Sequence, residues 1–257
     1  MKDLLLFDVD GTLTVPRNKI TNDMIDILKI LHNDKNVEIG FVGGSNLEKQ
    51  IEQLGEENFY LFTHRFSENG LLYYKGNNLI ETQKFSNYFG EELFKKLINI
   101  CLYVLSETDY KIKRGTFIEY RNGLINISPI GRGCSQDERD EFYEYDLKNK
   151  LREKMINQIK KKWIKYLIDN EYDLKKYELN FSIGGQISVD IFPVGWDKTY
   201  CLKFIKDSYN KIYFFGDKTS KGGNDYEIYN NERVIGNYVK TYNDTINILK
   251  YLIQTKF

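Results

Sequence analysis

The sequence predicts an α/β protein in which a Rossmann-like parallel-sheet core is interrupted by an inserted α+β cap domain that contains an antiparallel sheet. Three observations support this architecture. Apolar strand patterns alternate with helical patterns over roughly the first 80 residues, as in a parallel sheet. From about Thr82 the rhythm changes, and Asn122-Gly123 joins two short strand patterns into a hairpin. Beyond Pro193 the alternation of helix and strand returns.

The elements of the core follow from the spacing of apolar residues. Short apolar runs predict strands, and apolar residues three and four positions apart predict helices. The predicted strands lie at 4–9, 37–42 and 211–215. The predicted helices lie at about 22–32, after Ser45, from Lys198 and from about Asn243. We therefore expect the core to comprise residues 1–81 and 193–257.

The inserted cap domain is expected over residues 82–192. Its predicted strands lie at 116–121, 124–127, 178–183 and 186–192. Its predicted helices lie at about 90–105 and over a long charged stretch at about 137–168. The strongly basic part at 160–176 is better explained as a solvated helix face than as a membrane or nucleic-acid surface.

The composition limits the classes of function. Basic and acidic side chains are equal in number, 37 each, so no overall charge attracts nucleic acid. Cys101, Cys134 and Cys201 lie far apart, which argues against a disulfide framework and against a cysteine zinc site. The apolar run that starts at Leu4 is too short for a signal peptide or a membrane span. We therefore expect a cytoplasmic protein that binds neither nucleic acid nor membranes.

The strongest chemical signal is the pair Asp8 and Asp10, which follows the first predicted strand. Side chains two apart on a strand share a face, so we expect both carboxylates at the carboxyl end of the sheet, where open α/β sheets bind ligands. Like charges this close repel each other, and a divalent cation between them removes the repulsion. A turn-capping aspartate before Gly11 explains only one of the two. The pair therefore predicts a magnesium-dependent phosphotransferase.

The second predicted strand ends in Gly43-Gly44-Ser45. Ser45 and Glu48 match the capping box that opens a helix. The same helix N-terminus presents free backbone N–H groups, which suit a phosphate. Ser45 can therefore cap the helix, bind a ligand, or do both.

Two later segments bring further charge to the same edge of the sheet. Lys198 can supply a point charge to a phosphoryl group, although a single lysine is more often solvated. Asp217 ends an apolar strand, and Asp225 follows a glycine-rich turn. Asp8, Asp217 and a main-chain oxygen of Asp10, with Asp225 in the surrounding shell, would make an oxygen site suited to Mg²⁺.

In this order the motifs resemble those of the haloacid dehalogenase superfamily: a paired-aspartate strand, a strand-end serine, a lysine and a strand-end acidic cluster. The resemblance implies that Asp8 forms an aspartyl-phosphate and that Asp10 acts as general acid and base. It also implies that Mg²⁺ and Lys198 balance the charge of the transferring phosphoryl group.

The cap domain carries Arg121, Arg132 and Arg139 within a short stretch. Each alone is normally a surface residue, but guanidinium groups bind phosphate bidentately, so a cluster can hold a second phosphate. Ser188 and Asp190, two apart on a predicted strand, share a face that can hydrogen-bond sugar hydroxyls. An ordinary polar strand face explains this last pair as well.

Over nearly the whole chain the sequence resembles the eukaryotic-type phosphomannomutases. The segments that carry the resemblance are Arg121-Asn122-Gly123, Pro129-Ile130-Gly131-Arg132, residues 184–190, Gly195-Trp196-Asp197-Lys198 and residues 214–219. The family interconverts mannose 6-phosphate and mannose 1-phosphate, with a hexose 1,6-bisphosphate as intermediate and primer, and supplies GDP-mannose synthesis. It is usually a homodimer joined through the caps. The resemblance implies substrate contacts from Arg17, Ser45, Arg121, Arg132, Arg139, Ser188, Asp190 and Lys198.

The chain departs from the family pattern at two places. The lysine-rich segment near 160–177 is longer and is expected to elaborate the cap surface. Asn230-Asn231 stands where the family has an aspartate near a second cation, so the sequence gives no support for that ion. Two alternative functions remain open: a sugar-phosphate phosphatase on the same core, and a non-catalytic sugar-phosphate sensor.

Overall fold

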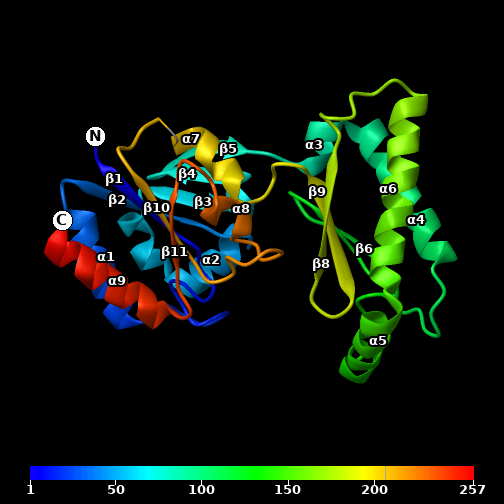
Figure 1. Ribbon diagram of the computed structural model, residues 1–257, viewed down its shortest axis with the longest axis horizontal. Coiled ribbons are helices and arrows are strands. Elements are labelled where there is room, and N and C mark those ends of the chain that lie inside the picture. Colours follow the sequence, from blue (N-terminus) through cyan, green and yellow to red (C-terminus); the bar gives the residue numbers. More distant parts are fainter. Residues whose placement is uncertain (206) are drawn as a thin grey trace. The chain divides into compact units, whose positions relative to one another are not determined.

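The structure, a computed structural model, describes residues 1–205 and 207–257 (Figure 1). These residues form two compact units. Unit 1 comprises Met1–Thr82 with Gly195–Phe257, and unit 2 comprises Gln83–Val194. Within the described ranges, no helix combines the length and apolar composition needed to cross a membrane. A largely parallel sheet in one unit and an antiparallel sheet in the other confirm the predicted fold class.

The sheet of unit 1 has the strand order β11-β10-β1-β2-β3-β4-β5. Its parallel strands are β1 (Asp3–Phe7), β2 (Val37–Val42), β3 (His64–Ser67), β10 (Ile212–Gly216) and β11 (Ile235–Tyr238). The antiparallel edge consists of β4 (Leu72–Lys75) and β5 (Asn78–Thr82). The carboxyl ends of β1 and β10 meet because the two strands pair in parallel register.

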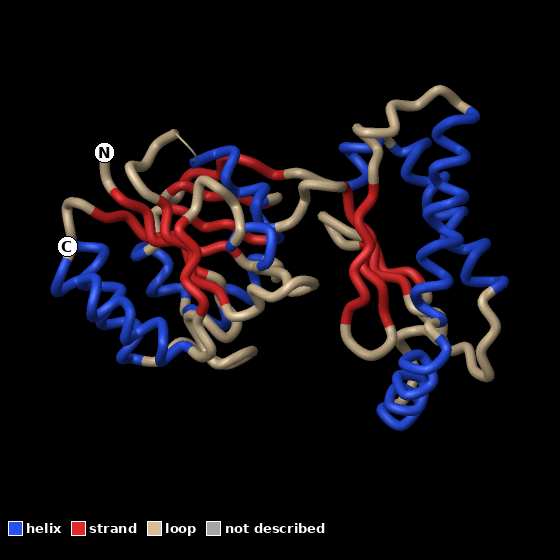
Figure 2. The backbone as a smooth tube through the Cα atoms, in the orientation of Figure 1, coloured by secondary structure: helices blue, strands red, loops and turns tan. Residues whose placement is uncertain are grey.

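Strand β1 is buried along its whole length, as expected for a parallel strand that is covered on both faces. Leu5 and Phe7 belong to one apolar cluster, with α1 (Asn22–Asn33), α2 (Leu47–Leu54) and α9 (Tyr242–Thr255). Leu4 and Leu6 belong to another, with α7 (Leu202–Ile205) and α8 (Tyr226–Tyr229). Figure 2 shows these helices on the two sides of the sheet. The alternation of strand side chains thus places helices on both faces.

Several core elements differ from the prediction. Strand β1 ends at Phe7 rather than at residue 9, because the carbonyl of Val9 accepts three N–H groups, from Thr12, Leu13 and Thr14, in a tight turn. The predicted helix at Lys198 begins as the short 3-10 helix η3 (Lys198–Cys201) before α7. Strands β3, β4, β5 and β11 and the short helices η1 (Glu56–Leu61) and η2 (Glu68–Gly70) were not predicted.

The sheet of unit 2 has the order β6-β7-β9-β8. Its strands are β6 (Ile118–Tyr120), β7 (Ile125–Ile127), β8 (Leu179–Gly184) and β9 (Ser188–Pro193). Its helices are α3 (Phe85–Phe89), α4 (Glu91–Glu107), α5 (Gln136–Asn149) and α6 (Leu151–Asp169). In Figure 1, α4 and α6 lie on one side of this sheet. Unit 2 is therefore an α+β domain with helices on one face.

The two faces of the unit 2 sheet differ in chemistry. Ile125 and Ile127 pair with Ile191 and Val189, all four are buried, and α6 packs against β8 and β9. Asn126 pairs with Asp190, so these polar side chains lie on the opposite face. One face therefore forms the core of unit 2, and the other presents polar groups.

The long helix predicted at 137–168 is two helices, α5 and α6, which meet at Lys150 with φ 55°. A buried ion pair holds this corner: Asp146 accepts hydrogen bonds from the Arg152 N–H at 2.8 Å and from Arg152 Nε at 2.7 Å. Arg152 Nη1 also donates to the carbonyls of Gly185 at 3.0 Å and Ser188 at 3.2 Å. The corner between the helices therefore also fixes the turn between β8 and β9.

Candidate active site

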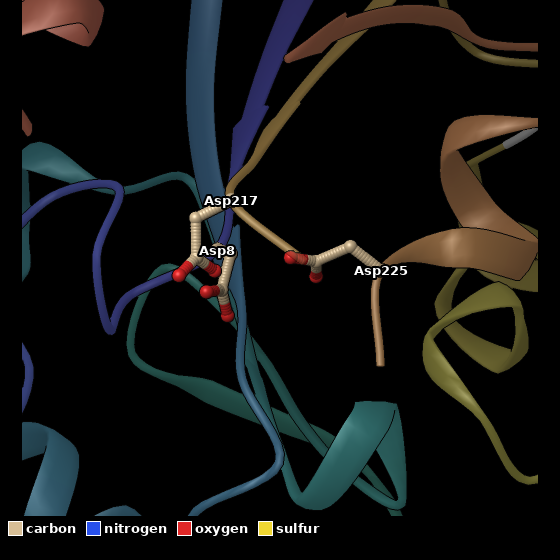
Figure 3. Close-up of side chains that lie close together, drawn as sticks. All are labelled: Asp8, Asp217 and Asp225. Atoms are coloured by element: carbon tan, nitrogen blue, oxygen red, sulfur yellow. The ribbon is translucent and has the colours of Figure 1, made fainter. Parts of the chain in front are cut away.

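Three carboxylates gather at the carboxyl end of the parallel sheet. Asp8 directly follows β1, Asp217 follows the neighbouring β10, and Asp225 precedes α8. Each offers an oxygen atom, and these oxygen atoms lie within 4.8 Å of one another. Figure 3 shows the carboxylates of Asp8 and Asp217 side by side, with that of Asp225 directed toward them.

The donor set fits a divalent cation. Asp8 and Asp225 are buried, and Asp217 Oδ1 is a buried atom without a hydrogen-bond partner among the described residues. Buried carboxylate oxygens without partners are costly unless a cation compensates them. Gly11, whose φ is 85°, leaves room for the Asp217 carboxylate. A Cβ at this position would lie only 2.5 Å from Asp217 Oδ2. Carboxylate oxygens at this spacing are ligands of the kind that Mg²⁺ prefers.

Lys198 lies among these carboxylates and is 1% exposed. Its Nζ donates to Asp8 Oδ1 and, at 2.5 Å, to Asp225 Oδ1. The Asp197 carboxylate caps η3 by accepting the Thr199 N–H at 2.8 Å, which fixes the start of the helix that carries Lys198. Lys198 thus lies among the strand-end carboxylates, on a 3-10 helix, and its role toward a phosphoryl group stays a prediction.

The electrostatics of this group are dominated by burial. Burial disfavours the charged form of Lys198, but Asp8 and Asp225 outweigh it and raise the lysine pKa, so the side chain stays an ammonium. Burial raises the pKa of Asp8; Lys198 opposes this rise and Asp225 adds to it. One ammonium facing three carboxylates leaves excess negative charge, which a bound cation would neutralise.

Asp10 does not share the environment of Asp8. Its Oδ1 accepts the Arg17 N–H at 2.7 Å and the Gln53 side-chain amide at 2.7 Å. Arg17 is exposed, with φ 64°, and what it contributes here is its backbone N–H. Because β1 ends before Asp8, the expectation that the two carboxylates share one face of a strand is wrong. They lie on consecutive parts of a turn and have different partners.

The expected capping box at Ser45 is also wrong. Helix α2 begins at Leu47, and its cap is Asn46, whose side chain accepts the Lys49 N–H at 3.3 Å. Ser45 stands one residue earlier, and its carbonyl accepts the Glu68 N–H at 3.0 Å. Its ligand-binding role stays a prediction.

In unit 2, the three predicted arginines come together. Arg132 Nε lies 2.8 Å and Arg121 Nη2 3.1 Å from Glu119 Oε2. Arg139 Nη2 donates to the Arg132 carbonyl at 2.8 Å. Arg121 and Arg132 thus share one carboxylate, Arg139 contacts the backbone of Arg132, and the phosphate-binding role of the three stays a prediction.

The two predicted sugar-contacting residues of β9 adjoin this cluster. Arg132 Nη1 donates to Asn126 Oδ1 at 2.7 Å and approaches Ser188 Oγ at 3.4 Å. Asn126 in turn donates to Asp190 Oδ1 at 2.6 Å. The structure therefore links Arg132, Ser188 and Asp190 on the polar face of the sheet.

Three residues of these networks were not predicted: Gln53, Glu119 and Asn126. Asn126 joins the polar face through its pairing with Asp190, and Glu119 through its pairing with Asn126, so both depend on strand register. Linear spacing does not give that register. A signal for Gln53 was present, because a helix whose buried face carries glutamines at positions 50 and 53 is unusual.

Comparisons with known proteins agree with this geometry. The sequence model of the family "eukaryotic phosphomannomutase" matches residues 24–255. The chain is 50% identical over 242 residues to a phosphomannomutase of Dendrobium officinale, covering 94% of this chain and 90% of that one. It is 51% identical over 251 residues to phosphomannomutase 1 of Dictyostelium discoideum, covering 97% and 96%.

A solved structure supports the fold. Trehalose-6-phosphate phosphatase of Aspergillus fumigatus aligns with a TM-score of 0.58 at 13% identity, covering 99% of this chain and 93% of that one. At that identity the likeness concerns the fold alone. The family match and the relatives of about half-identical sequence go further: this chain belongs to the eukaryotic phosphomannomutase family.

Proposed function

We propose that this chain is a phosphomannomutase, an isomerase that interconverts mannose 6-phosphate and mannose 1-phosphate through a phosphorylated Asp8. The observation that carries the proposal is the buried Asp8 carboxylate at the end of β1, in contact with the Lys198 ammonium and grouped with Asp217 and Asp225. The relatives of about half-identical sequence that are named phosphomannomutases support the substrate. The reaction supplies mannose 1-phosphate for GDP-mannose synthesis.

The proposed chemistry moves one phosphoryl group at a time. An Asp8 oxygen attacks phosphorus of a hexose 1,6-bisphosphate primer, and the bond from phosphorus to the sugar oxygen breaks. Asp10 donates a proton to that leaving oxygen. In the next step Asp10 removes the proton from a hydroxyl of the hexose monophosphate, whose oxygen takes the phosphoryl group from Asp8. Lys198 holds its positive charge beside the reacting oxygen atoms throughout.

The metal proposed for unit 1 is Mg²⁺. Asp8, Asp217 and Asp225 would hold it, together with a main-chain oxygen of Asp10. When bound, it would withdraw charge from the transferring phosphoryl group. Asp217 Oδ1, which has no hydrogen-bond partner in the part of the chain that the structure describes, supports this assignment.

Unit 2 is proposed to bind the sugar and its second phosphate. Arg121, Arg132 and Arg139 would bind the phosphate, and Ser188 and Asp190 the sugar hydroxyls, on the polar face described above. Arg17 and Ser45 are further proposed substrate contacts. A mutase must keep water from the phosphorylated aspartate, and binding energy from the distal phosphate can drive that exclusion.

Two further parts of the proposal concern the state of the protein. We propose a homodimer joined through the cap and a cytoplasmic location. The three buried cysteines are compatible with a reducing compartment.

A primed mutase assay tests the function. Purified protein, Mg²⁺ and a trace of glucose 1,6-bisphosphate are given mannose 1-phosphate, and mannose 6-phosphate and free phosphate are measured in the same tube. The proposal expects isomerisation with little free phosphate. Release of phosphate equal to the loss of substrate would identify a phosphatase instead.

A further inference from the structure

Gln53 contacts the carboxylate that the proposed mechanism uses to move protons. It lies on α2 and is 8% exposed. Its Nε2 donates to Asp10 Oδ1 at 2.7 Å, across 43 positions of sequence. A buried amide that donates to a carboxylate at this distance makes a strong, directional hydrogen bond.

A second donor converges on the same oxygen. The Arg17 N–H also lies 2.7 Å from Asp10 Oδ1. In the described part of the chain, both hydrogen bonds that reach the Asp10 side chain end on Oδ1. One carboxylate oxygen is therefore engaged twice, which leaves Oδ2 to take up and give the proton.

Gln53 also fixes the backbone on which Asp10 lies. Its carbonyl accepts the Ile20 N–H at 2.8 Å, so Gln53 holds the segment 10–20 at both ends. The next residue, Leu54, is fully buried in the core of unit 1 and anchors the helix. Gln53 thus connects a packed helix to both ends of the segment that carries Asp10.

We propose that Gln53 is a positioning residue, whose amide sets the rotation of the Asp10 carboxylate so that Oδ2 faces the reacting sugar oxygen. The terminal torsion of aspartate is broad, so without the Gln53 amide, and with the Arg17 N–H as the remaining donor among the described residues, the carboxylate can rotate about that single hydrogen bond and samples more orientations. Proton transfer needs a near-linear approach at hydrogen-bond distance, which a freely rotating carboxylate seldom presents. The inference rests on the proposed acid–base role of Asp10.

The test compares two leaving groups. Gln53→Met keeps the length of the side chain and removes the donor. With enzyme in excess, phosphorylation of Asp8 by glucose 1,6-bisphosphate requires a proton for the departing sugar oxygen, whereas nitrophenolate leaves p-nitrophenyl phosphate without one. We expect Gln53→Met to slow phosphorylation by glucose 1,6-bisphosphate by about 10- to 100-fold and nitrophenolate release by less than about 3-fold. The inference would be overturned if Gln53→Met slowed both reactions equally or if it slowed neither of them.

Gln50→Met is the matched control. Gln50 lies on the same helix and is fully buried, but its side chain accepts the Ser67 hydroxyl instead of donating to Asp10. We expect this variant to keep the ratio of the two rates. Should Gln53→Met fail to fold, Gln53→Asn keeps a buried amide and withdraws it by one methylene, and the same selective loss is expected.

Asp10→Ala separates this inference from the proposed function. If Asp10→Ala keeps the wild-type rate of phosphorylation by glucose 1,6-bisphosphate, the acid–base role itself is wrong. If Asp10→Ala loses that rate while Gln53→Met retains it, the role of Asp10 stands and that of Gln53 fails. In the Asp10→Ala background, Gln53→Met should cause no further selective loss, because the group it positions is gone.

Discussion

At the scale of single residues, the buried Lys198 ammonium partly balances the negative charge of the three strand-end carboxylates. Lys198 contacts Asp8 and Asp225, whereas Asp217 beside them has an oxygen without a partner in residues 1–205 and 207–257. Burial raises the pKa of Asp217; Lys218 opposes this rise and Asp225 adds to it. The group is therefore arranged for a further positive charge, and Asp8, the proposed nucleophile, is part of the same arrangement.

The first prediction concerns Asp8. Asp8→Asn should lower mutase turnover by about 10³-fold or more, because an amide neither attacks phosphorus nor carries charge for the metal. The measurement is the primed assay, with circular dichroism to show that the variant is folded. Turnover near that of the wild type would exclude Asp8 as the nucleophile.

The second prediction concerns Arg139. Arg139→Gln should raise the KM for hexose monophosphate by about 10- to 100-fold, because a charge-assisted hydrogen bond to phosphate is lost. Phosphorylation of Asp8 by p-nitrophenyl phosphate, which has no distal phosphate, should change little. Arg114→Gln is the control, since Arg114 is an exposed arginine of the same unit that contacts Glu138. An equal effect on both reactions would contradict the assignment.

At the scale of elements, buried polar contacts join helices and strands at defined points. In unit 2 the Asp146–Arg152 pair holds the corner of α5 and α6 and reaches the turn between β8 and β9. In unit 1 His64 on β3 contacts Tyr73 on β4 and, through Tyr209, Glu38 on β2. Each contact has a consequence for stability that can be measured.

Arg152→Met should lower the free energy of unfolding by about 3–5 kcal/mol, because the buried Asp146 loses its opposite charge and two carbonyl groups lose the guanidinium donor. Urea denaturation followed by circular dichroism measures this. Restoring apolar packing with Asp146→Leu in the same chain should recover part of the loss. A change below about 1 kcal/mol would show that the pair is dispensable.

His64 should make the protein acid-sensitive. Burial lowers the pKa of His64 to about 4 from the ordinary 6.5, although Glu38 opposes it. Between these values the unfolded chain binds a proton that the folded chain does not. Stability is therefore unaffected by His64 above pH 6.5 and falls by about 3 kcal/mol as the pH drops to 4. Urea denaturation of the wild type and His64→Gln across this range should show a steeper fall in the wild type.

The elements with the strongest patterns were the predictable ones. Strand β2 lies at Val37–Val42, as predicted, because β-branched and aromatic residues dominate the segment and Glu38 is its one charged residue. Strand β11 escaped prediction because Ile235–Tyr238 is short, partly exposed and lacks an apolar run. The break at Lys150 also escaped, because the charge pattern continues through it and the reason for the break lies in the contacts of Arg152.

At the scale of the whole molecule, each unit carries its own part of the proposed chemistry. Unit 1 contains the carboxylates and Lys198, and unit 2 contains the arginine cluster and the polar sheet face. The charged side chains were predictable as types. Their partners were less so: Asp10 was expected beside Asp8 on a strand, but both lie beyond the end of the strand and Gln53 binds Asp10.

Magnesium should stabilise unit 1 selectively. At about 100 times its dissociation constant, Mg²⁺ should add about 2.7 kcal/mol to the free energy of unfolding, because only the folded site binds it. Hydrogen exchange should slow around β1 and β10 and stay unchanged in α5 and α6, and chelation should reverse the effect. Asp217→Asn should weaken the response. The proposed site would be contradicted if Mg²⁺ slowed hydrogen exchange equally in both units, or as much in Asp217→Asn as in the wild type.

Two glycines, Gly11 and Gly216, determine the space available to the carboxylates of the proposed ion site. A Cβ on Gly11 would lie 2.5 Å from Asp217 Oδ2, and one on Gly216 would lie 2.8 Å from Asp225 Oδ2. Both carboxylates therefore occupy space that a side chain at either glycine would fill. Magnesium demands near-ideal geometry with bonds of about 2.0–2.1 Å, so a Cβ that displaced either carboxylate would weaken the proposed ion site. The geometry of that site would thus depend on residues that bind no cation at all.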